Sequence, residues 1–371
     1  VNEMIAWFGI TETKKIAIAF NKKPKIYFRV NTLKTTMKEC LEIFKKNNID
    51  VGLINKLENG LVLKSKPRAI RKLPGYFEGK WLIQDRSSQW VAPLLSPIRG
   101  DKILDACAAP GTKTTHLAQL IKDEGEILAI DRSDIRLKLL KENLERLNIK
   151  SVKSLKIDAA KLIEIKPEYI NYFDKILIDA PCSGLGTLAR NPDARWKITK
   201  KSIDQLIIIQ EKLLENIVPL LNKNGLLVYS TCTICPSENN LLIEKFLKKN
   251  KNLQLVFEKQ ILPNSDYLGD GFYAAIISLA SAAGIWVAGR QVWLQSLPED
   301  EVPLCGPPLE YILEVFPFGD LLTALFMGDG NCAETSWQFL GLSMAGWSLI
   351  WFALFLVLSI LVILKSRSIN S

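Results

Sequence analysis

Residues 102–122, KILDACAAPGTKTTHLAQLIK, lead from a short apolar run through a turn of small residues into a helical pattern. Downstream, short apolar runs keep alternating with longer helical stretches, which is typical of a doubly wound α/β fold with a parallel sheet. Upstream, residues 1–98 mix a strand-like segment, PKIYFRVNTL, with a helical one, TTMKECLEIFKKNN, and predict a small α+β module. The clearest downstream elements are helices over residues 113–122, 134–147 and 202–221 and a strand over residues 225–232.

Charge is unevenly distributed along the 371 residues, whose formal net charge is +9. Residues 1–272 carry +14, whereas residues 273–371 carry −5 and hold one Lys and five of the nine Trp. Hydrophobic content of 48% and charged content of 23% exclude a disordered or collagen-like chain. The basic part favours a polyanionic partner such as RNA, although solvating lysines would give the same count. The abrupt change in composition suggests two unlike segments joined near residues 274–278.

Residues suited to a nucleoside-type ligand follow the predicted strands, and in open α/β sheets ligands bind at the carboxyl ends of strands. The small residues after Asp105 allow close backbone approach, and the helix that follows offers free N–H groups. Asp131 ends the second strand, where a carboxylate typically holds ribose hydroxyls. Asp158 follows the third strand, within reach of an adenine amine. The phosphate-binding pattern GxxxxGK[ST] is absent, so the pattern favours a nucleoside over a purely structural sheet.

Two cysteines and a carboxylate are predicted at the same sheet edge. Asp179 and Cys182 follow the fourth strand, and Cys232 follows the fifth. A thiolate is the most nucleophilic common side chain, so this grouping favours a reactive site. A single cysteine is often a buried small hydrophobic residue, which is our interpretation of Cys40. Cys232 and Cys235 also form a CxxC, but zinc requires two further ligands and we expect no metal.

Eight blocks occur in order between about residues 5 and 277: RVNTLK, IQDRSSQ, DACAAPGTKT, AIDRS, KIDA, DAPCSGLGTLARNPDARWK, YSTCTICPSEN and GDGFYAA. They resemble the RNA 5-cytosine methyltransferase family, specifically the bacterial Sun/RsmB-type ribosomal RNA enzymes and their NSUN relatives. The resemblance implies an RNA-binding α+β module over residues 1–98 and a Rossmann-like methyltransferase sheet over residues 99–277. Thr112 stands where the family usually has a second glycine. Relatives usually also carry an all-helical RNA-binding domain before the part that matches residue 1.

The same resemblance implies S-adenosylmethionine as the cofactor and RNA, in particular ribosomal RNA, as the substrate. It assigns Cys232 as the nucleophile on carbon 6 of cytosine, Cys182 to product release and Asp179 to charge on the ring. Residues 1–15 lack the features of an export signal, so we expect a cytoplasmic, monomeric enzyme with reduced thiols. The implied cofactor-binding residues are Cys107, Ala108, Ala109, Pro110, Gly111, Thr112, Lys113, Asp131, Asp158 and Asp179.

The last part of the chain has the pattern of a membrane segment. Residues 345–364, AGWSLIWFALFLVLSILVIL, form an uncharged run of the length that crosses a bilayer. A second candidate span, from about Ala274 to Leu297, is rich in small residues and contains Arg290. With both ends in the cytoplasm, residues 298–344 become an extracytoplasmic loop. We therefore expect residues 278–371 to anchor the chain in a bacterial inner membrane by two helices.

Within that segment, the blocks GRQVWLQ, LCGPPLEYIL and GDGNCAETSWQFLGLSMAGWSL resemble the second half of disulfide bond formation protein B. The resemblance implies that Cys305 and Cys332 exchange disulfides with a periplasmic thiol carrier, or form a structural disulfide. The helices that pass electrons to quinone in that family have no counterpart in this sequence, so we do not expect quinone to serve the tail. The alternative functions are a membrane thiol–disulfide exchange protein with a passenger methyltransferase domain, and an RNA-binding sheet without catalysis.

Overall fold

The computed structural model describes residues 1–65, 69–263, 269–279, 338–339, 342–343 and 350–351. The chain divides into two compact units. The first comprises residues 1–250 and 255–277, and the second comprises residues 251–254 and 278–371. The second unit contributes two short paired strands, β12 (Gln338–Phe339) and β13 (Leu342–Ser343). All residues that carry the candidate chemistry of the methyltransferase part lie in the first unit.

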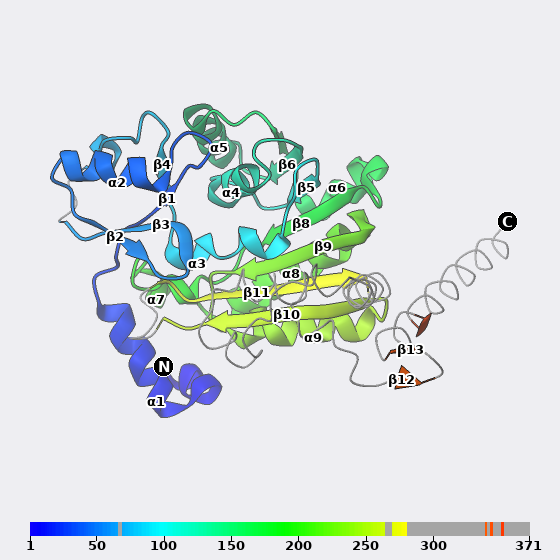
Figure 1. Cartoon of the computed structure of the whole chain (residues 1–371). Helices are drawn as coiled ribbons and strands as arrows, with labels where there is room; N and C mark the ends of the chain where they lie inside the picture. Colours follow the sequence, from blue (N-terminus) through cyan, green and yellow to red (C-terminus); the bar gives the residue numbers. More distant parts are fainter. Residues whose placement is uncertain (66–68, 264–268, 280–337, 340–341, 344–349, 352–371) are drawn as a thin grey trace, which may run out of the picture. The chain divides into compact units, whose positions relative to one another are not determined.

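The N-terminal part of the first unit contains a four-stranded antiparallel sheet in the order β2-β3-β1-β4 (Figure 1). This arrangement confirms the predicted small α+β module. Thr36 and Glu39 start its central helix with a capping box, in which each side chain accepts a hydrogen bond from the other residue's backbone N–H. The elements are α1 (Asn2–Asn21), β1 (Tyr27–Val30), α2 (Met37–Lys46), β2 (Val51–Ile54), β3 (Leu57–Leu63) and β4 (Trp81–Ile83).

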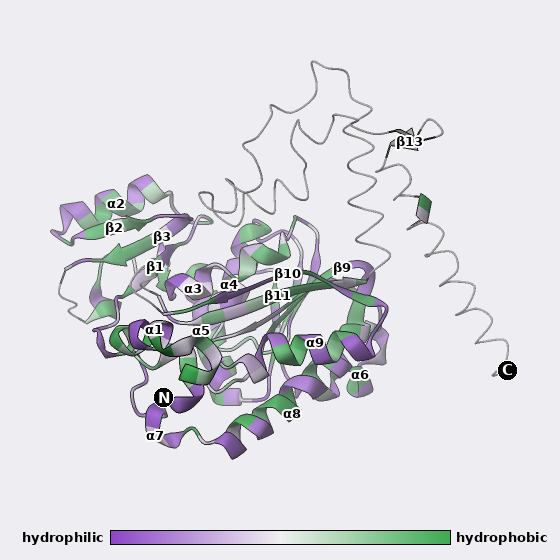
Figure 2. Ribbon diagram, turned by 90° about the horizontal axis from the view of Figure 1, so that it is seen from below, coloured by the Kyte–Doolittle hydropathy of each residue, from purple (hydrophilic) through white to green (hydrophobic). Residues whose placement is uncertain are grey.

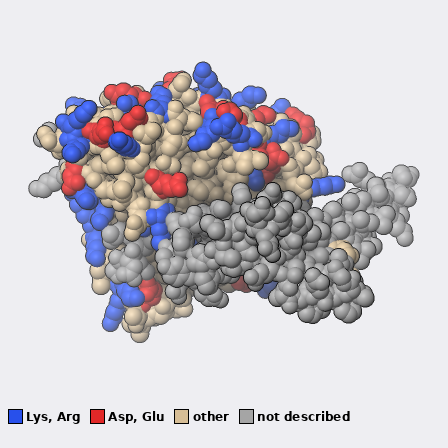
Figure 3. Space-filling view, viewed as in Figure 1, with Lys and Arg blue, Asp and Glu red and all other residues tan. Residues whose placement is uncertain are grey.

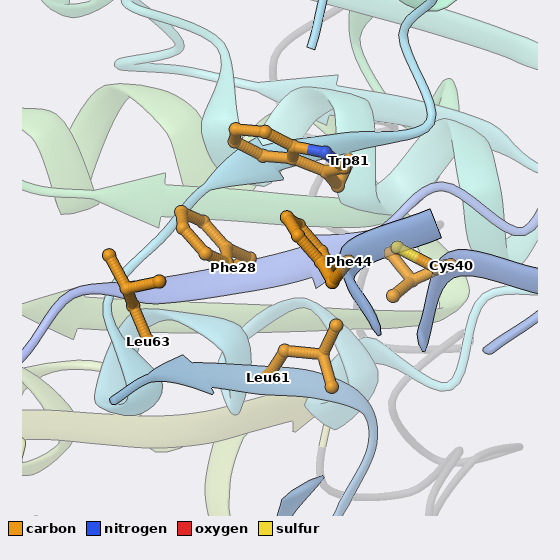
Figure 4. Close-up of a cluster of buried hydrophobic side chains, with 7 residues drawn as sticks. Phe28, Cys40, Phe44, Leu61, Leu63 and Trp81 are labelled. Carbon is orange, nitrogen blue, oxygen red and sulfur yellow. The ribbon is translucent and has the colours of Figure 1, made fainter. Parts of the chain in front are cut away.

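An aromatic cluster forms the core of this small sheet (Figure 4). Phe28 of β1 packs on Trp81 of β4, with ring centres 4.5 Å apart, and stacks on Phe44 of α2 at 5.8 Å. Cys40 is 1% exposed within the same cluster, as expected for a small hydrophobic residue. Burial raises the pKa of the Cys40 thiol to about 11, which leaves it without a nucleophilic role at neutral pH.

The larger sheet has seven strands in the order β10-β11-β9-β8-β5-β6-β7. The pairs β5–β6, β5–β8, β6–β7 and β8–β9 are parallel, which confirms the predicted doubly wound α/β fold. Parallel strands bring their carboxyl ends to one edge, where the candidate residues gather. The strands are β5 (Lys102–Asp105), β6 (Glu126–Asp131), β7 (Val152–Lys156), β8 (Phe173–Asp179), β9 (Leu221–Thr231), β10 (Leu253–Ile261) and β11 (Phe272–Leu279).

The helices of this domain form two groups, as expected when helices cover both faces of a parallel sheet. Helix α4 packs against α3 and α5, whereas α8 packs against α6 and α9. In Figure 2 each of these helices carries both hydrophobic (green) and hydrophilic (purple) residues, whereas the strands of the large sheet are mostly hydrophobic. The helices are α3 (Arg86–Gln89), α4 (Thr112–Leu120), α5 (Asp134–Leu147), α6 (Leu162–Ile165), α7 (Ala194–Lys197), α8 (Lys200–Ile217) and α9 (Asn240–Lys249).

The start of the weaker membrane candidate, placed at about Ala274, is wrong. Residues 274–279 belong to β11, which lies between β9 and β10 in the sheet and is almost wholly buried. A short run of small and β-branched apolar residues fits a buried strand as well as a helix, so the pattern alone could not separate the two. The remainder of that candidate, and residues 345–364 except Ile350 and Trp351, lie outside the described residues. In the part of the chain that the structure describes, no helix is both long and apolar enough to span a bilayer.

Candidate active site

The turn between β5 and α4 requires a glycine at one position. Gly111 has a φ of +96°, and a Cβ added there would lie 3.0 Å from the Leu140 side chain. A residue with a side chain would therefore be strained and crowded. Thr112 is already the first residue of α4, where glycine's conformational freedom is not needed. The family departure at Thr112 thus leaves the turn intact and the first N–H groups of α4 at the sheet edge.

Two of the predicted carboxylates lie along this edge. Asp131, at the end of β6, is 4% exposed and accepts hydrogen bonds from the backbone N–H groups of Ala109 (3.3 Å) and Ser133 (2.9 Å). Arg136 forms an ion pair with it at 3.4 Å. Asp158, after β7, is exposed and accepts from the N–H of Ala160 at 3.1 Å. The structure thus connects Asp131 directly to the β5–α4 turn and leaves the Asp158 side chain open to solvent.

Burial determines the protonation of two residues beneath the turn. Asp105 is fully buried, and burial raises the pKa of its carboxyl to about 7, against a hydrogen bond from Thr114 (2.7 Å) that lowers it. Its Oδ1 atom has no hydrogen-bond partner among the described residues. Burial also raises the pKa of the Cys107 thiol far above its usual range, and the neighbouring carboxylates raise it further. The Cys107 thiol is therefore neutral and is not a nucleophile.

The two candidate catalytic cysteines come together although they are distant in sequence. Cys182 follows β8 and Cys232 follows β9, and these strands pair in parallel with Asp179 opposite Ser230. The two Sγ atoms lie 3.4 Å apart, and both residues are partly exposed. Cys235, the other cysteine of the CxxC, is buried, and burial raises the pKa of its thiol to about 11. The structure therefore pairs Cys232 with Cys182 and places Cys235 in the core.

The surroundings of Cys182 raise the pKa of its thiol. The pKa of the Cys182 thiol is held well above its usual range by the hydrogen bond with Cys232, and burial and the nearby Glu238 carboxylate act in the same direction. Cys182 consequently keeps its proton at neutral pH, and either sulfur of the pair can donate the hydrogen bond between them. A donor at this distance stabilises negative charge on the acceptor.

A lysine joins the carboxylate beside these cysteines. Lys113 Nζ lies 2.6 Å from Asp179 Oδ2, and the Ser230 hydroxyl donates to Asp179 Oδ1 at 3.0 Å. The Lys113 side chain is 9% exposed, whereas that of Asp179 is 30% exposed. The Lys113 ammonium also lies 5.0 Å from the ring centre of Phe272. The sequence placed Lys113 only in the cofactor-binding turn, but the structure connects it to the cysteine side of the edge.

Glu238 is a site residue that the sequence did not single out. It is fully buried, in the turn Pro236–Glu238 after β9. Its Oε1 accepts hydrogen bonds from the Ser183 backbone N–H (2.8 Å) and from Gln210 Nε2 (3.1 Å), and its Oε2 accepts from the Ser183 hydroxyl. Because Ser183 follows Cys182, the carboxylate ties the two cysteine-bearing loops together. The only available signal was one acidic residue within the otherwise uncharged block YSTCTICPSEN.

Arg29 is a second residue whose role the sequence did not show. It lies in β1, is 1% exposed, and donates to the Thr112 carbonyl (2.7 Å), Thr115 Oγ1 (2.9 Å) and Gln119 Oε1 (3.3 Å). Burial lowers the pKa of its guanidinium to about 9. These bonds attach the small sheet to the start of α4. An arginine within the apolar strand YFRV was the available signal.

Comparison with known families identifies the fold. The family described as 16S rRNA methyltransferase RsmB/F matches residues 92–282. This chain belongs to the RsmB/F family. The ferredoxin-like domain of the same family matches residues 1–70, and S-adenosylmethionine-dependent methyl transfer is the chemistry of the family. A third match, to disulfide bond formation protein DsbB, covers residues 254–362. Its first part coincides with β10 and β11, and Cys305 and Cys332 lie outside the described residues.

Individual relatives agree with the family. A probable ribosomal RNA small subunit methyltransferase B from Synechocystis is 43% identical over 66% of this chain and 54% of its own length. The chain spans about half to three fifths of the curated relatives that it matches. Two crystal structures from Pyrococcus horikoshii share the Rossmann-like methyltransferase fold. A methyltransferase homolog is 30% identical (TM-score 0.64, 73% of this chain, 91% of its own). NSun6 with SFG, an S-adenosylmethionine analogue, is 25% identical (TM-score 0.68, 75% and 97%).

Proposed function

We propose that this chain methylates carbon 5 of cytosine in ribosomal RNA through a covalent bond between Cys232 and carbon 6. The observation that carries the proposal is the Cys182–Cys232 pair, 3.4 Å apart at the end of β8 and β9 beside the Asp179–Lys113 ion pair. Carbon 5 of cytosine is a poor nucleophile, so methyl transfer needs prior activation of the ring. The thiol pair and the ion pair are the groups that such activation requires. The relatives named as ribosomal RNA methyltransferases support RNA as the substrate.

The residues at the sheet edge fit S-adenosylmethionine. When bound, this cofactor supplies an electrophilic methyl group on a positively charged sulfonium. The Asp131 and Asp158 carboxylates offer acceptors for the ribose hydroxyls and the adenine amine. The Gly111 turn permits close backbone approach, and the start of α4 presents N–H groups. Asp179, partly exposed at the same edge, adds negative charge that complements a sulfonium.

Cys232 performs the first covalent step in this proposal. Its thiolate, stabilised by the Cys182 proton, attacks carbon 6 and forms a carbon–sulfur bond, and the electron pair of the 5,6 double bond moves into the ring. Lys113 and Asp179 together hold a proton near ring nitrogen N3 and so stabilise the charge that develops. The ring then has enamine character, and carbon 5 can accept the methyl group. The target base must first leave any helix to reach these groups.

Cys182 acts in release. Once Cys232 is bonded to carbon 6, its sulfur is a thioether and carries no negative charge beside Cys182. Cys182 then gives its thiol proton to solvent, and the resulting thiolate takes the proton from carbon 5. The electron pair of that C–H bond restores the 5,6 double bond, and Cys232 leaves as a thiolate. The two cysteines thus exchange roles between attack and release.

The test is transfer of labelled methyl from S-adenosylmethionine to ribosomal RNA by the full chain. Cys232→Ala should abolish transfer, and Cys182→Ala should accumulate a covalent RNA–protein adduct on a denaturing gel. Cys40→Ala, at a buried cysteine of helix α2, is the control and should keep activity. A Cys232→Ala protein with wild-type activity would refute the nucleophile, and the absence of an adduct with Cys182→Ala would refute the release role.

We further propose that residues 278–371 form a DsbB-like membrane segment. In the sequence it follows the RNA-binding module (residues 1–98) and the methyltransferase domain (residues 99–277). The DsbB match over residues 254–362 supports this assignment. In this proposal the methyltransferase domain lies in the cytoplasm, and Cys305 and Cys332 lie outside it, where a periplasmic thiol carrier could reach them. A membrane-impermeant maleimide added to intact, reduced bacterial cells should label Cys305 and Cys332 but not Cys182. Labelling of neither tail cysteine would refute the topology.

A further inference from the structure

One aromatic side chain stands out on the surface of the first unit. Trp196 is 87% exposed, the highest value among the large hydrophobic side chains that the structure describes. No ring of another described residue packs against it. Leaving an indole in water forgoes a large amount of apolar burial, and exposed aromatic groups of this kind commonly serve as contacts for a partner.

The helix that carries Trp196 is held firmly beside the cysteine loops. Arg195 donates to the Phe20 carbonyl (2.8 Å) and to Asn21 Oδ1 (2.9 Å) at the end of α1. Ala194 packs into the same apolar cluster as Leu188, which follows Cys182, and Ile234, which follows Cys232. The indole is therefore presented from a fixed backbone that shares its packing with both reactive loops. Such rigidity reduces the entropy lost on binding.

The surroundings of Trp196 are basic. Lys197, Lys200 and Lys201 are exposed, and the two latter make no ion pair with a described residue. Two acidic residues lie near these lysines in the sequence. Asp193 lies 3.9 Å from Lys197, with both side chains largely exposed, so the pairing is weak. Asp204 lies one turn after Lys200 on α8 and is also exposed. Lys and Arg side chains line the left side of the view in Figure 3, the side on which Figure 1 shows α1 and α7. The local charge thus complements a polyanion.

We infer that Trp196 and the lysines that follow it form a docking surface for an unpaired RNA segment next to the target cytosine. A base of that segment stacks on the Trp196 ring, while Lys197, Lys200 and Lys201 contact the phosphates. This inference rests on the proposed function, because it places the RNA strand that enters the cysteine site. The favoured partner is single-stranded RNA and not a protein, because the indole adjoins three exposed lysines, which suits stacked bases joined by phosphates.

The experiment measures binding of the full chain to a fluorescein-labelled unpaired RNA oligonucleotide by fluorescence anisotropy. Trp196→Ala should raise Kd about tenfold, because a stacked base is lost. Trp196→Phe keeps an aromatic ring, so its Kd should stay within about threefold of the wild-type value. Ile165→Ala removes an exposed apolar side chain, 51% exposed, from α6 outside the RNA-binding module and should leave Kd unchanged. The affinity for S-adenosylmethionine should be the same in all four proteins.

A duplex of the same sequence provides the second readout. Bases in a duplex cannot stack on the indole, so Trp196→Ala should change the duplex Kd far less than the single-strand Kd. Equal losses for both RNAs would overturn the stacking assignment, and an unchanged single-strand Kd would overturn the surface altogether, as would a change only in the oligomeric state. Methyl transfer is measured in parallel. A wild-type protein that binds the RNA but does not methylate it would refute the proposed function. The effect of Trp196→Ala on the Kd would still test the docking surface.

Discussion

Glu238 shows at the residue scale how a buried charge can serve reactive neighbours without touching a substrate. Its carboxylate receives donors from Ser183 and Gln210 and thereby fixes the loop that carries Cys182 against the loop that carries Cys232. A buried charged group with its hydrogen bonds satisfied is stable, whereas removing one partner leaves the others uncompensated. We therefore regard Glu238 as a positioning residue for the cysteine pair.

Replacing Glu238 should affect turnover more than cofactor binding. Glu238→Ala leaves the Ser183 N–H without an acceptor and lets the Cys182 loop move, so kcat should fall at least tenfold, on the order expected for misplaced catalytic groups. Glu238→Gln keeps an acceptor for the Ser183 N–H, so its kcat should fall less. The measurements are kcat and the KM for S-adenosylmethionine. Glu211→Ala, which removes a surface carboxylate paired with Lys245, is the control. An unchanged kcat in Glu238→Ala would contradict the positioning role.

Asp105 should give the stability of the protein a pH dependence. Its folded-state pKa of about 7 lies above the ordinary value of 3.8, so the folded protein binds this proton more tightly than the unfolded chain. The stabilisation is complete below about pH 4 and is lost as the pH rises through about 7. In urea denaturation, the unfolding free energy of Asp105→Asn relative to that of the wild type should rise by about 3 kcal/mol between pH 5 and pH 8. A difference independent of pH would contradict this origin.

Individual residues differ in how far sequence could predict them. Asp131, Asp179, Cys182 and Cys232 were placed correctly at the sheet edge, because strand ends and parallel pairing follow from a local pattern. The Lys113–Asp179 ion pair depends on how β5, β8 and α4 pack, and no local pattern encodes it. Arg29 and Glu238 were missed for the same reason. Their partners are distant in sequence, and a single charged residue in an apolar block does not identify them.

Helix α1 shows at the element scale how a peripheral element can support a site. Ile16 and Phe20 on its buried side form one cluster with Leu188 and Ile234, and these two residues belong to the two cysteine-bearing loops. The helix ends where Arg195 of α7 donates to the Phe20 carbonyl and to the side chain of Asn21. Contacts of this kind hold loops in place that otherwise lack regular secondary structure. The position of α1 is thus coupled to the geometry of the reactive thiols.

Ile16→Ala should therefore reduce both stability and activity. Ile16 is fully buried, so the substitution leaves a cavity and should cost about 2–4 kcal/mol of unfolding free energy. Methyl transfer should decrease at temperatures where the protein is still folded, because the cavity lies against both loops. Ile18 lies on the same helix and is 59% exposed, so Ile18→Ala should change neither the unfolding free energy nor methyl transfer. Equal effects of the two substitutions would contradict the packing argument.

Whole elements were predicted best where local signals agreed. The helix over residues 134–147 matches α5, which Ser133 caps and which ends before Asn148 in the left-handed conformation. The helix expected to reach residue 221 ends at Ile217, because Pro219 has no N–H to continue it, and a 3₁₀ turn follows. Only the start of the membrane candidate at about Ala274 was wrong, because residues 274–279 belong to a buried strand whose neighbours only the folded sheet provides.

At the scale of the whole molecule, β11 sets where the catalytic unit can end. It lies between β9 and β10, and residues 272–277 are fully buried. A chain ending at residue 280 should keep its fold and its methyl transfer, whereas a chain ending at residue 271 leaves the edges of β9 and β10 unpaired and should aggregate. Circular dichroism and methyl-transfer assays compare the two. Equal melting temperatures for both chains would contradict an essential β11.

The place of β11 also has a consequence for biosynthesis. The strand is the last of the large sheet in sequence, yet it occupies an interior position, and Gly271 just before it donates to the carbonyl of Gly186 beside the Cys182 loop. During translation, β9 and β10 therefore leave the ribosome before the strand that separates them exists. The reactive thiols reach their final arrangement only after residue 279 has emerged. Under the proposed function, a nascent chain shorter than this lacks the assembled cysteine site and is therefore inactive.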